Sequence, residues 1–256
     1  MNPGFEFVLI LMSFSGTFGK YVYVEESRSW DEAQQYCRTH FIDLAPINNE
    51  YDNMKLAESY NIPRGSWIGL MKPNATQIWM WSGGARVEQF FWATGGEVKT
   101  AYIDAVGAFS KGNWYIYRPD SSQPFFCFNV ILVEERKTWE KALEYCREHH
   151  SDLASVASET EMMLIQSKLK NHVPSSMVWI GLHSFQKGWL WVDGQPMTYN
   201  AWSSNENPVC PPLEMQCAAL KADKMKNHTT SGGQMMEETS VWEAHNCYDE
   251  LPFICY

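Results

Sequence analysis

Trp67-Ile68-Gly69-Leu70 and Trp179-Ile180-Gly181-Leu182 are two copies of one four-residue string, and the second copy begins 112 positions after the first. An aromatic and aliphatic run of this length predicts a short strand. Because tryptophan is a rare residue, two identical strings around it indicate an internal repeat.

The repeat extends over most of the chain. The 12 Trp residues form two ordered sets of six, in which the first five pairs of counterparts are 109 to 112 positions apart and the sixth pair is 128 apart. In order, the pairs are Trp30/Trp139, Trp67/Trp179, Trp79/Trp189, Trp81/Trp191, Trp92/Trp202 and Trp114/Trp242. Chance does not align so many rare residues in one order, so the chain is a tandem duplication. Residues 20–128 are the first unit and residues 129–256 the second unit.

The two units differ in length mainly at one place. The spacing between counterparts rises by 18 after Trp92 and Trp202, so the extra residues of the second unit lie between Trp202 and Trp242. Loops accept insertions and cores do not, which predicts a surface loop here in both units. The segment Lys221–Ser240 is polar and contains Gly and Met, and it is either a tolerated insertion or an adaptable contact surface.

The sequence of each unit predicts two helices followed by strands. Trp139, Ala142 and Cys146 have the i, i+3, i+7 spacing of one helix face, as do their counterparts in the first unit. Ser158 and Glu161 form a capping box ahead of a second helix. The other expected caps are Ser29, Asn49 and Thr138, the second helix covers Met162–Leu169, and opening strands are expected at Tyr21–Val24 and Asn129–Val133. This order of elements predicts an α+β fold for each unit.

No linker separates the two units. Cys127-Phe128 ends the first predicted core, and Val130 already belongs to the next one. A linker between independently moving domains is usually a polar stretch rich in Gly, Pro or Ser. We therefore expect the two units to pack closely, or at least to be stiffly joined.

Charge and hydropathy exclude two classes of function. The chain has a net charge of −10 and an isoelectric point of about 5.2, whereas binding to nucleic acid needs a basic surface. After the N-terminal region, no window approaches the 18 or more apolar residues of a membrane-spanning helix. The sequence predicts a protein with no membrane span that binds no nucleic acid.

The first residues predict export. Phe7–Phe18 is an apolar run too short to span a bilayer, and it fits a signal peptide over residues 1–19 although no basic residue precedes it. The alternative is an N-terminal core strand. A signal peptide predicts a secreted, extracellular protein, in which the sequons at Asn74 and Asn227 are expected to carry glycans.

Cysteines in an exported chain predict disulfides. The repeat pairs Cys37 with Cys127 in the first unit, and Cys146 with Cys255 in the second. Each bond would join the first helix of its unit to the last strand. Since each closes a long loop, each is expected to stabilise its unit by roughly 4–5 kcal/mol.

The second unit contains three further cysteines. Cys217 and Cys247 are predicted to form a bond of their own, and spacing to neighbouring residues makes Thr100 and Pro119 their counterparts in the first unit. Cys210 is left over in a proline-rich loop. It is either a free thiol or the link of a disulfide-bonded dimer.

The motifs together resemble a known family. Each unit is similar to a C-type lectin-like domain over essentially its whole length. The similarity depends on the Trp and Cys of the first helix, the Trp-Ile-Gly-Leu string, the Trp-x-Trp segment and a terminal Pro-Phe-x-Cys motif, which is Pro124–Cys127 in one unit and Pro252–Cys255 in the other. The tandem arrangement resembles the macrophage mannose receptor and secretory phospholipase A2 receptor group. The resemblance implies domains of two helices and antiparallel strands, in which a long loop carries the ligand site.

The resemblance also implies where calcium would bind. Sugar-binding members hold Ca²⁺ with a Glu-Pro-Asn or Gln-Pro-Asp motif and a Trp-Asn-Asp motif, since the ion takes six to eight oxygen ligands. This chain departs from both motifs: the second unit has Glu206-Asn207-Pro208 and Trp242-Glu243-Ala244, and the first has Gly96-Glu97-Val98 and Trp114-Tyr115-Ile116. We therefore expect no calcium site of the usual kind and no cofactor.

The function implied by the resemblance is non-catalytic recognition of a glycan or a protein. The residues expected to contact the ligand are Trp202, Glu206, Asn207, Glu214, Glu243 and Asn246. The alternative is a Ca²⁺-dependent lectin in which these residues, apart from the tryptophan, form an altered calcium site. An enzyme is not expected, because the chain has no Gly-x-Ser-x-Gly, His-Glu-x-x-His or phosphate-loop motif.

Overall fold

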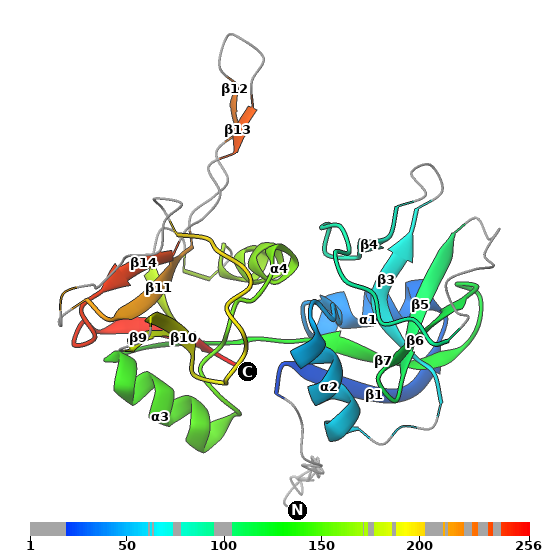
Figure 1. Cartoon of the computed structure of the whole chain (residues 1–256), viewed down its shortest axis with the longest axis horizontal. Coiled ribbons are helices and arrows are strands. Elements are labelled where there is room, and N and C mark those ends of the chain that lie inside the picture. The colour runs from blue at the N-terminus through cyan, green and yellow to red at the C-terminus, as the bar shows by residue number, and fades with distance from the viewer. Residues whose placement is uncertain are drawn as a thin grey trace, which may run out of the picture.

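The computed structural model has two lobes that lie side by side, one for each unit (Figure 1). It describes residues 19–60, 62, 64–73, 78–94, 104–170, 172–173, 177–185, 188–202, 212, 215–222, 227–229, 235–237 and 242–256. Each lobe is a sheet accompanied by two helices, in agreement with the α+β prediction.

The first unit is a sheet of strand order β1-β7-β3-β5-β6, with β2 beside β7 and β4 beside β3. Its elements are β1 Tyr21–Arg28, α1 Trp30–His40, β2 Asp43–Leu44, α2 Glu50–Ser59, β3 Ser66–Lys72, β4 Met80–Trp81, β5 Ala105–Ser110, β6 Asn113–Tyr117 and β7 Gln123–Phe128. The pairing of β3 with β7 is parallel, and the other pairs are antiparallel.

The second unit repeats this topology. Its sheet has the order β14-β11-β9-β15-β8, with β10 beside β9, and β9 pairs with β15 in parallel. Its elements are β8 Ile131–Lys137, α3 Trp139–His149, α4 Glu159–Leu169, β9 Met177–Phe185, β10 Gly188–Trp191, β11 Cys217–Lys221, β14 Trp242–His245 and β15 Leu251–Cys255. Each strand of this path takes the place of its counterpart in the first unit.

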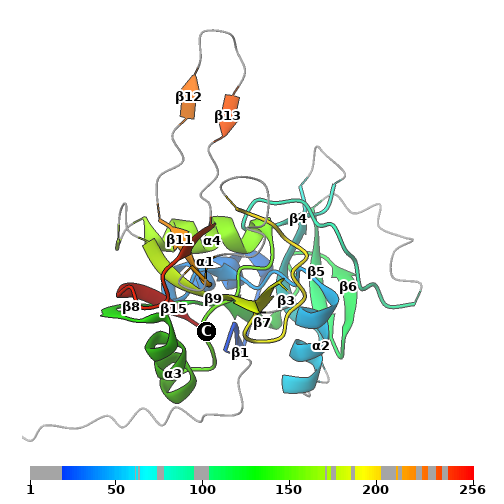
Figure 2. The ribbon, with the colours of Figure 1, turned by 60° about the vertical axis from the view of Figure 1, so that its left-hand side comes forward.

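Strand register locates the extra length of the second unit. In the first unit Phe109 of β5 pairs with Trp114 of β6, five positions later, whereas Leu220 of β11 pairs with Trp242 of β14, 22 positions later. Nearly all of the insertion therefore lies between β11 and β14. It contains a separate two-stranded sheet, β12 Asn227–Thr229 and β13 Met235–Glu237, which stands away from the lobe (Figures 1 and 2). The sequence had predicted a loop here and not a hairpin.

The two Trp-Ile-Gly-Leu strings lie at the centre of the two sheets, in β3 and β9. Close packing of the backbone explains why this position is a glycine. A Cβ atom on Gly181 would lie 2.5 Å from the carbonyl oxygen of Leu153, and the Gly181 amide donates to the Ala154 carbonyl oxygen at 2.8 Å. A larger residue would force this backbone contact apart, so the string requires glycine here.

Indole hydrogen bonds fasten the first helix of each unit to the central strand. Trp30 Nε1 donates to the Ile68 carbonyl oxygen, and Trp139 Nε1 donates to the Ile180 carbonyl oxygen, both at 2.9 Å. Both tryptophans are buried. Since a buried indole N–H needs an acceptor, this repeated bond fixes the position of α1 and α3 on their sheets.

The predicted helix caps are only partly as expected. Ser158 Oγ accepts from the Glu161 amide at 3.1 Å, but the Glu161 carboxylate accepts from the amide of Ala157, so the predicted reciprocal box is incomplete. The complete capping box is formed instead by Ser29 and Glu32 at the start of α1. The Glu161 carboxylate is diverted because it pairs with a residue of the other unit.

Among the described residues the structure contains three disulfides, which are the two pairs expected from the repeat and the further bond predicted in the second unit. They join Cys37 to Cys127, Cys146 to Cys255 and Cys217 to Cys247, over sequence separations of 90, 109 and 30 residues. The first two fasten α1 to β7 and α3 to β15, as predicted. The six bonded cysteines lie in described segments, whereas Cys210 lies outside them.

The counterpart assigned to Cys217 is wrong. Cys217 is cross-strand from His183, and in the first unit the residue cross-strand from Met71 is Val106, not Thr100. Met71 precedes His183 by the repeat spacing. The prediction failed because it used spacing alone across a region where the two units differ in length. Thr100 itself lies outside the described residues.

The two units share a buried ion cluster. Lys20 Nζ lies 2.8 Å from Asp52 Oδ1 of the first unit and 2.5 Å from Glu161 Oε1 of the second, and all three side chains are at most 1% exposed. The ammonium group lies over the rings of Tyr21 and Tyr256, 5.6 and 5.7 Å from their centroids. Asp52 and Glu161 are counterparts, each three residues after its N-cap, so the lysine joins equivalent positions of the two units.

Further contacts surround this ion cluster. Asn48 Nδ2 donates to Glu161 Oε1 at 2.9 Å, and Tyr51 donates its hydroxyl to the Asp193 carbonyl oxygen at 2.6 Å. The rings of Phe128 and Tyr256 meet edge to face, 6.1 Å apart. Buried residues of both units belong to one hydrophobic cluster. The expectation of close packing between the units therefore agrees with the structure.

Candidate ligand-binding site

The long loop of each unit is closed by one parallel bridge between two tryptophans. In the second unit Trp202 bridges to Trp242, whose amide donates to the Ala201 carbonyl oxygen at 2.7 Å. In the first unit Trp92 bridges to Trp114 in the same way. The base of the loop is thus fixed by the sheet through β14 and β6.

The tryptophans at this base form a packed aromatic cluster. The Trp202 ring lies 4.5 Å from the ring of Trp189 and 5.8 Å from that of Trp242, and the Trp191 ring lies 5.3 Å from that of Trp242. Trp202 is only 3% exposed. Its ring offers a ligand almost no surface, so the burial argues against the predicted ligand contact and makes Trp202 a core residue.

Strand β14 presents one carboxylate at the predicted site. Glu243 Oε2 lies 3.7 Å from His245 Nε2, and the other ring nitrogen of His245 lies 3.7 Å from Asp249 Oδ2. Ala244, where the family motif has an acid, pairs with Ala218 and has no side-chain oxygen. Because adjacent residues of a strand point to opposite faces, no second ligand follows Glu243 on its face until His245.

Asn246 is already used by the backbone. Its Oδ1 accepts from the Tyr248 amide at 3.0 Å, and its carbonyl oxygen accepts from the Asp249 amide at 2.9 Å. These bonds form the turn that follows β14. Within the described residues, the Glu243 carboxylate is therefore the one side-chain oxygen group of the predicted ligand set that has no backbone partner.

Several predicted residues lie outside the described segments. These are Glu206, Asn207, Glu214, the leftover Cys210 and the sequon residue Asn74. The second sequon residue, Asn227, begins β12 of the inserted hairpin. Their predicted roles in ligand binding, disulfide linkage and glycosylation stay predictions.

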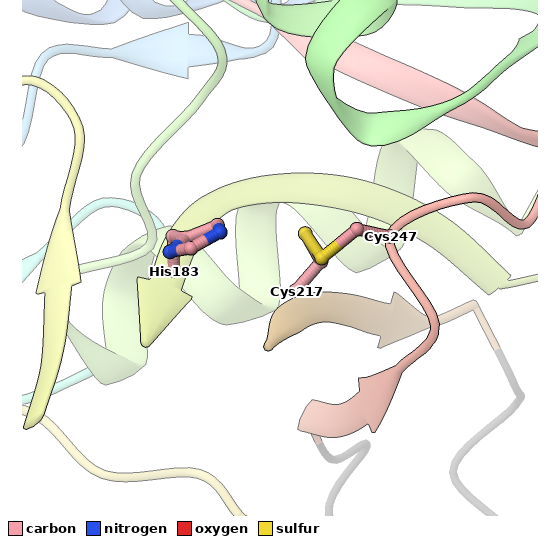
Figure 3. Close-up of side chains that lie close together, drawn as sticks. All are labelled: His183, Cys217 and Cys247. Atoms are coloured by element: carbon pink, nitrogen blue, oxygen red, sulfur yellow. A yellow bond between two sulfur atoms is a disulfide. The ribbon is translucent and has the colours of Figure 1, made fainter. Parts of the chain in front are cut away.

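One cluster of metal-ligand type lies where β9, β11 and the turn after β14 meet. The ligand atoms of His183, Cys217 and Cys247 are within 4.8 Å of one another. Figure 3 shows the imidazole beside the sulfur atoms, which are bonded to each other at 2.06 Å. A sulfur in a disulfide is not a thiolate and does not bind a metal as one. Burial lowers the pKa of His183, so its ring is neutral at pH 7.

None of the helices in the described part of the chain is long and apolar enough to cross a membrane. The longest of them, α1, α3 and α4, have 11 residues each.

Comparison with known proteins indicates the same family that the sequence motifs resemble. Residues 26–129 and 135–256 match the family described as "Lectin C-type domain". Human "Lymphocyte antigen 75" is 25% identical over 89% of this chain and 14% of its own length. The "Secretory phospholipase A2 receptor" of Oryctolagus cuniculus is 21% identical over 92% of this chain and 17% of that protein. The structure of human lithostathine is 27% identical, covers 49% of this chain and 88% of its own chain, and has a TM-score of 0.38.

The match covers both units apart from their first few residues. The receptor relatives are much longer, and the chain spans about a seventh of the length of the first of them. On the family match and on the three disulfides, the chain belongs to the C-type lectin domain family.

Proposed function

We propose that the chain is a non-catalytic extracellular recognition protein that binds a carbohydrate or a protein without the usual calcium site. The observation that supports this most directly is strand β14. Glu243 is followed by Ala244, which is paired within the sheet and contributes no oxygen. A calcium site of six to eight oxygens then lacks a ligand that the family motif supplies.

The proposal includes the organisation of the chain. A signal peptide over residues 1–19 is followed by one C-type lectin-like domain over 20–128 and another over 129–256. The protein is secreted, and Asn74 and Asn227 are glycosylated. The repeated strand order, the repeated indole hydrogen bonds and the two matched segments support the two domains.

The class of ligand is open between sugar and protein. The name of the phospholipase A2 receptor points to a protein ligand for that relative, and the family is named for lectins. The relative is about 21% identical, so its ligand does not transfer directly. A surface that needs no metal can recognise either class through hydrogen bonds and aromatic contacts.

A glycan array probed with and without a chelator tests this function. We expect the pattern of bound glycans, and the signal of each, to stay within about twofold when EDTA replaces Ca²⁺, because no metal bridges protein and sugar. The variant Glu243→Gln keeps the size of the side chain and removes its charge, so it should also leave the pattern unchanged. Loss of mannose-type binding in EDTA and in Glu243→Gln would support the calcium-dependent alternative instead.

A further inference from the structure

A groove in the second unit lies between α3 and the β9–β10 hairpin. Its volume is about 900 Å³. The side chains that define it are Trp139, Leu143, His183, Phe185, Leu190 and Tyr248. None of them takes part in the contacts between the two units. The groove is also separate from the loop base at Trp202, so it is independent of the proposed function.

Three large exposed hydrophobic side chains line this groove. Phe185, Leu190 and Tyr248 are 50%, 46% and 80% exposed, and they make up half of the large exposed hydrophobic residues in the described part of the chain. Isolated exposed apolar residues are ordinary, whereas a contiguous group of them marks an interaction surface.

Strand register places these side chains in one continuous surface. Leu190 of β10 is directly cross-strand from His183 of β9, and Phe185 lies two positions along β9 on the same face. The His183 ring lies 4.7 Å from the Phe185 ring and 4.8 Å from the Trp139 ring. The apolar surface therefore extends from the start of α3 to the end of the hairpin.

The floor of the groove is rigid and uncharged. The Cys217–Cys247 disulfide forms part of the lining and holds β11 to the turn after β14 (Figure 3). Its two residues are counterparts of Val106 and Pro119, so the bond exists in this unit alone. Burial keeps the His183 ring neutral, so no charge on the floor opposes an apolar side chain.

The first unit lacks this surface although it has the same fold. Its smaller groove, of about 270 Å³, is lined by Trp30, Met71, Pro73 and Pro119. By the repeat spacing, Pro73 stands where the second unit has Phe185, and Asp120 where it has Tyr248. The fold does not require the exposed aromatic residues, so their presence in one unit calls for a separate reason.

The rim of the groove is acidic. Glu140 and Glu144 on α3 have no ion-pair partner among the described residues, and Asp249 and Glu250 follow Tyr248 directly. The basic groups on α3 that line it are Lys141 and Arg147.

Part of the negative charge of Glu140 and Glu144 is uncompensated. Arg147 is already held by Asp152, with 3.1 Å between Nε and Oδ1. Of the charged groups that line the groove, Glu140 and Glu144 are thus opposed by Lys141 alone. A second copy of the chain would bring the same carboxylates and a net charge of −10, so charge disfavours self-association.

From the apolar wall and the acidic rim we infer that this groove docks a protein segment that presents leucine or phenylalanine side chains flanked by lysine or arginine. The apolar side chain fills the space between Phe185, Leu190 and Tyr248, and the basic flanks meet Glu140 and Glu144. A glycan fits less well, because aliphatic Leu143 and Leu190 offer sugar hydroxyls no hydrogen-bond partner.

A labelled peptide binding to the full chain tests the inference. The probe is fluorescein-Lys-Lys-Leu-Phe-Leu-Lys-Lys-amide, followed by fluorescence anisotropy at low ionic strength. We expect saturable binding at submillimolar or lower concentration. The matched peptide with Glu in place of every Lys should bind at least about tenfold more weakly, because its charges repel the rim. Equal binding of the two peptides, or no binding of the Lys peptide up to the millimolar range, would overturn the inference.

Substitutions in the groove test whether the Lys peptide binds there. Phe185→Ser combined with Leu190→Ser should lower the affinity for the Lys peptide at least about tenfold, since these residues provide the anchor pocket. Tyr248→Ser is a second variant that leaves the fold intact, because its side chain is 80% exposed. The matched control is Met54→Ser on α2, a residue that is 48% exposed and remote from the groove. Unchanged affinity in both groove variants, or loss of a glycan-array signal in them instead, contradicts a protein-docking groove.

Discussion

Replacement of Lys20 by methionine is expected to lower the free energy of unfolding by about 3–5 kcal/mol. The lysine is the single cation between Asp52 and Glu161, and all three side chains are essentially inaccessible. Methionine fills a similar volume but leaves two carboxylates buried side by side. The measurement is chemical denaturation followed by tryptophan fluorescence, with the full chain at pH 7.5.

The free energy of unfolding that Lys20→Met loses should depend on pH. Burial raises the pKa of Glu161 in the native protein, although the Lys20 ammonium lowers it. Without the ammonium, the pKa of Glu161 rises further. When the pKa of a carboxyl group is higher in the folded state than in the unfolded state, the protein loses stability as the pH rises from the unfolded-state pKa through the folded-state pKa. The deficit of Lys20→Met is therefore expected to be clearly smaller at pH 5 than at pH 7.5, where the carboxyl must ionise.

An exposed lysine provides the control for this result. Lys55 pairs with Glu58 at 3.2 Å, but its side chain is 39% exposed, so Lys55→Met should cost at most about 0.5 kcal/mol. Adding Glu161→Gln to Lys20→Met should restore part of the lost stability, because it removes one unpaired charge. If Lys20→Met costs no more than Lys55→Met, the ion cluster does not hold the units together.

The second large effect concerns the disulfides. Removal of the Cys146–Cys255 bond by double alanine replacement is expected to cost about 4.8 kcal/mol from loop-closure entropy, since it closes a separation of 109 residues. The Cys217–Cys247 bond closes 30 residues, and its removal is expected to cost about 3.6 kcal/mol. Denaturant unfolding under non-reducing conditions measures both losses.

Both disulfide variants belong in a Cys210→Ser background, so that no thiol remains to exchange with the other bonds. The serine variant itself is the control and should unfold like the parent chain, within about 0.5 kcal/mol. A larger loss for Cys217–Cys247 than for Cys146–Cys255 would contradict the entropic account. It would show instead that the shorter bond contributes chiefly through the packing of β11 on β14.

Much of the fold follows from the spacing of rare residues. Tryptophan and cysteine positions predicted the duplication and two of the disulfide pairs, because these residues have the same structural role in both units. The Cys217–Cys247 pair was predicted from cysteines that only the second unit contains. The α+β order followed from helix-face spacing at Trp139, Ala142 and Cys146, which are all buried on α3. Spacing failed at Thr100, because the units have different lengths there and only strand register identifies Val106 as the counterpart of Cys217.

The junction between the units was predicted only in outline. Glu161 was interpreted as half of a capping box, a local role that its sequence position fits. Its carboxylate instead pairs with Lys20, 141 positions earlier in the chain. No sequence pattern reports a contact of that range, although the equivalent placement of Asp52 and Glu161 is a signal that could have been used.

Half of the predicted ligand residues lie outside the described segments, so their roles stay predictions. Trp202 was expected at the ligand surface, but its ring packs between Trp189 and Trp242 and is buried. The exposed group of Phe185, Leu190 and Tyr248 was missed, because exposure depends on which face of β9 and β10 meets α3. Three residues from two segments of sequence become neighbours only through the register of the sheet.

A calorimetric titration of the full chain with Ca²⁺ tests the central claim most directly. The claim is that this chain recognises its ligand without the usual calcium site, since Ala244 supplies no oxygen and Asn246 is bonded within its turn. We expect no saturable heat up to millimolar Ca²⁺, and no change when mannose is added with the ion. A dissociation constant in the micromolar range, accompanied by mannose binding that disappears in EDTA, would contradict the account.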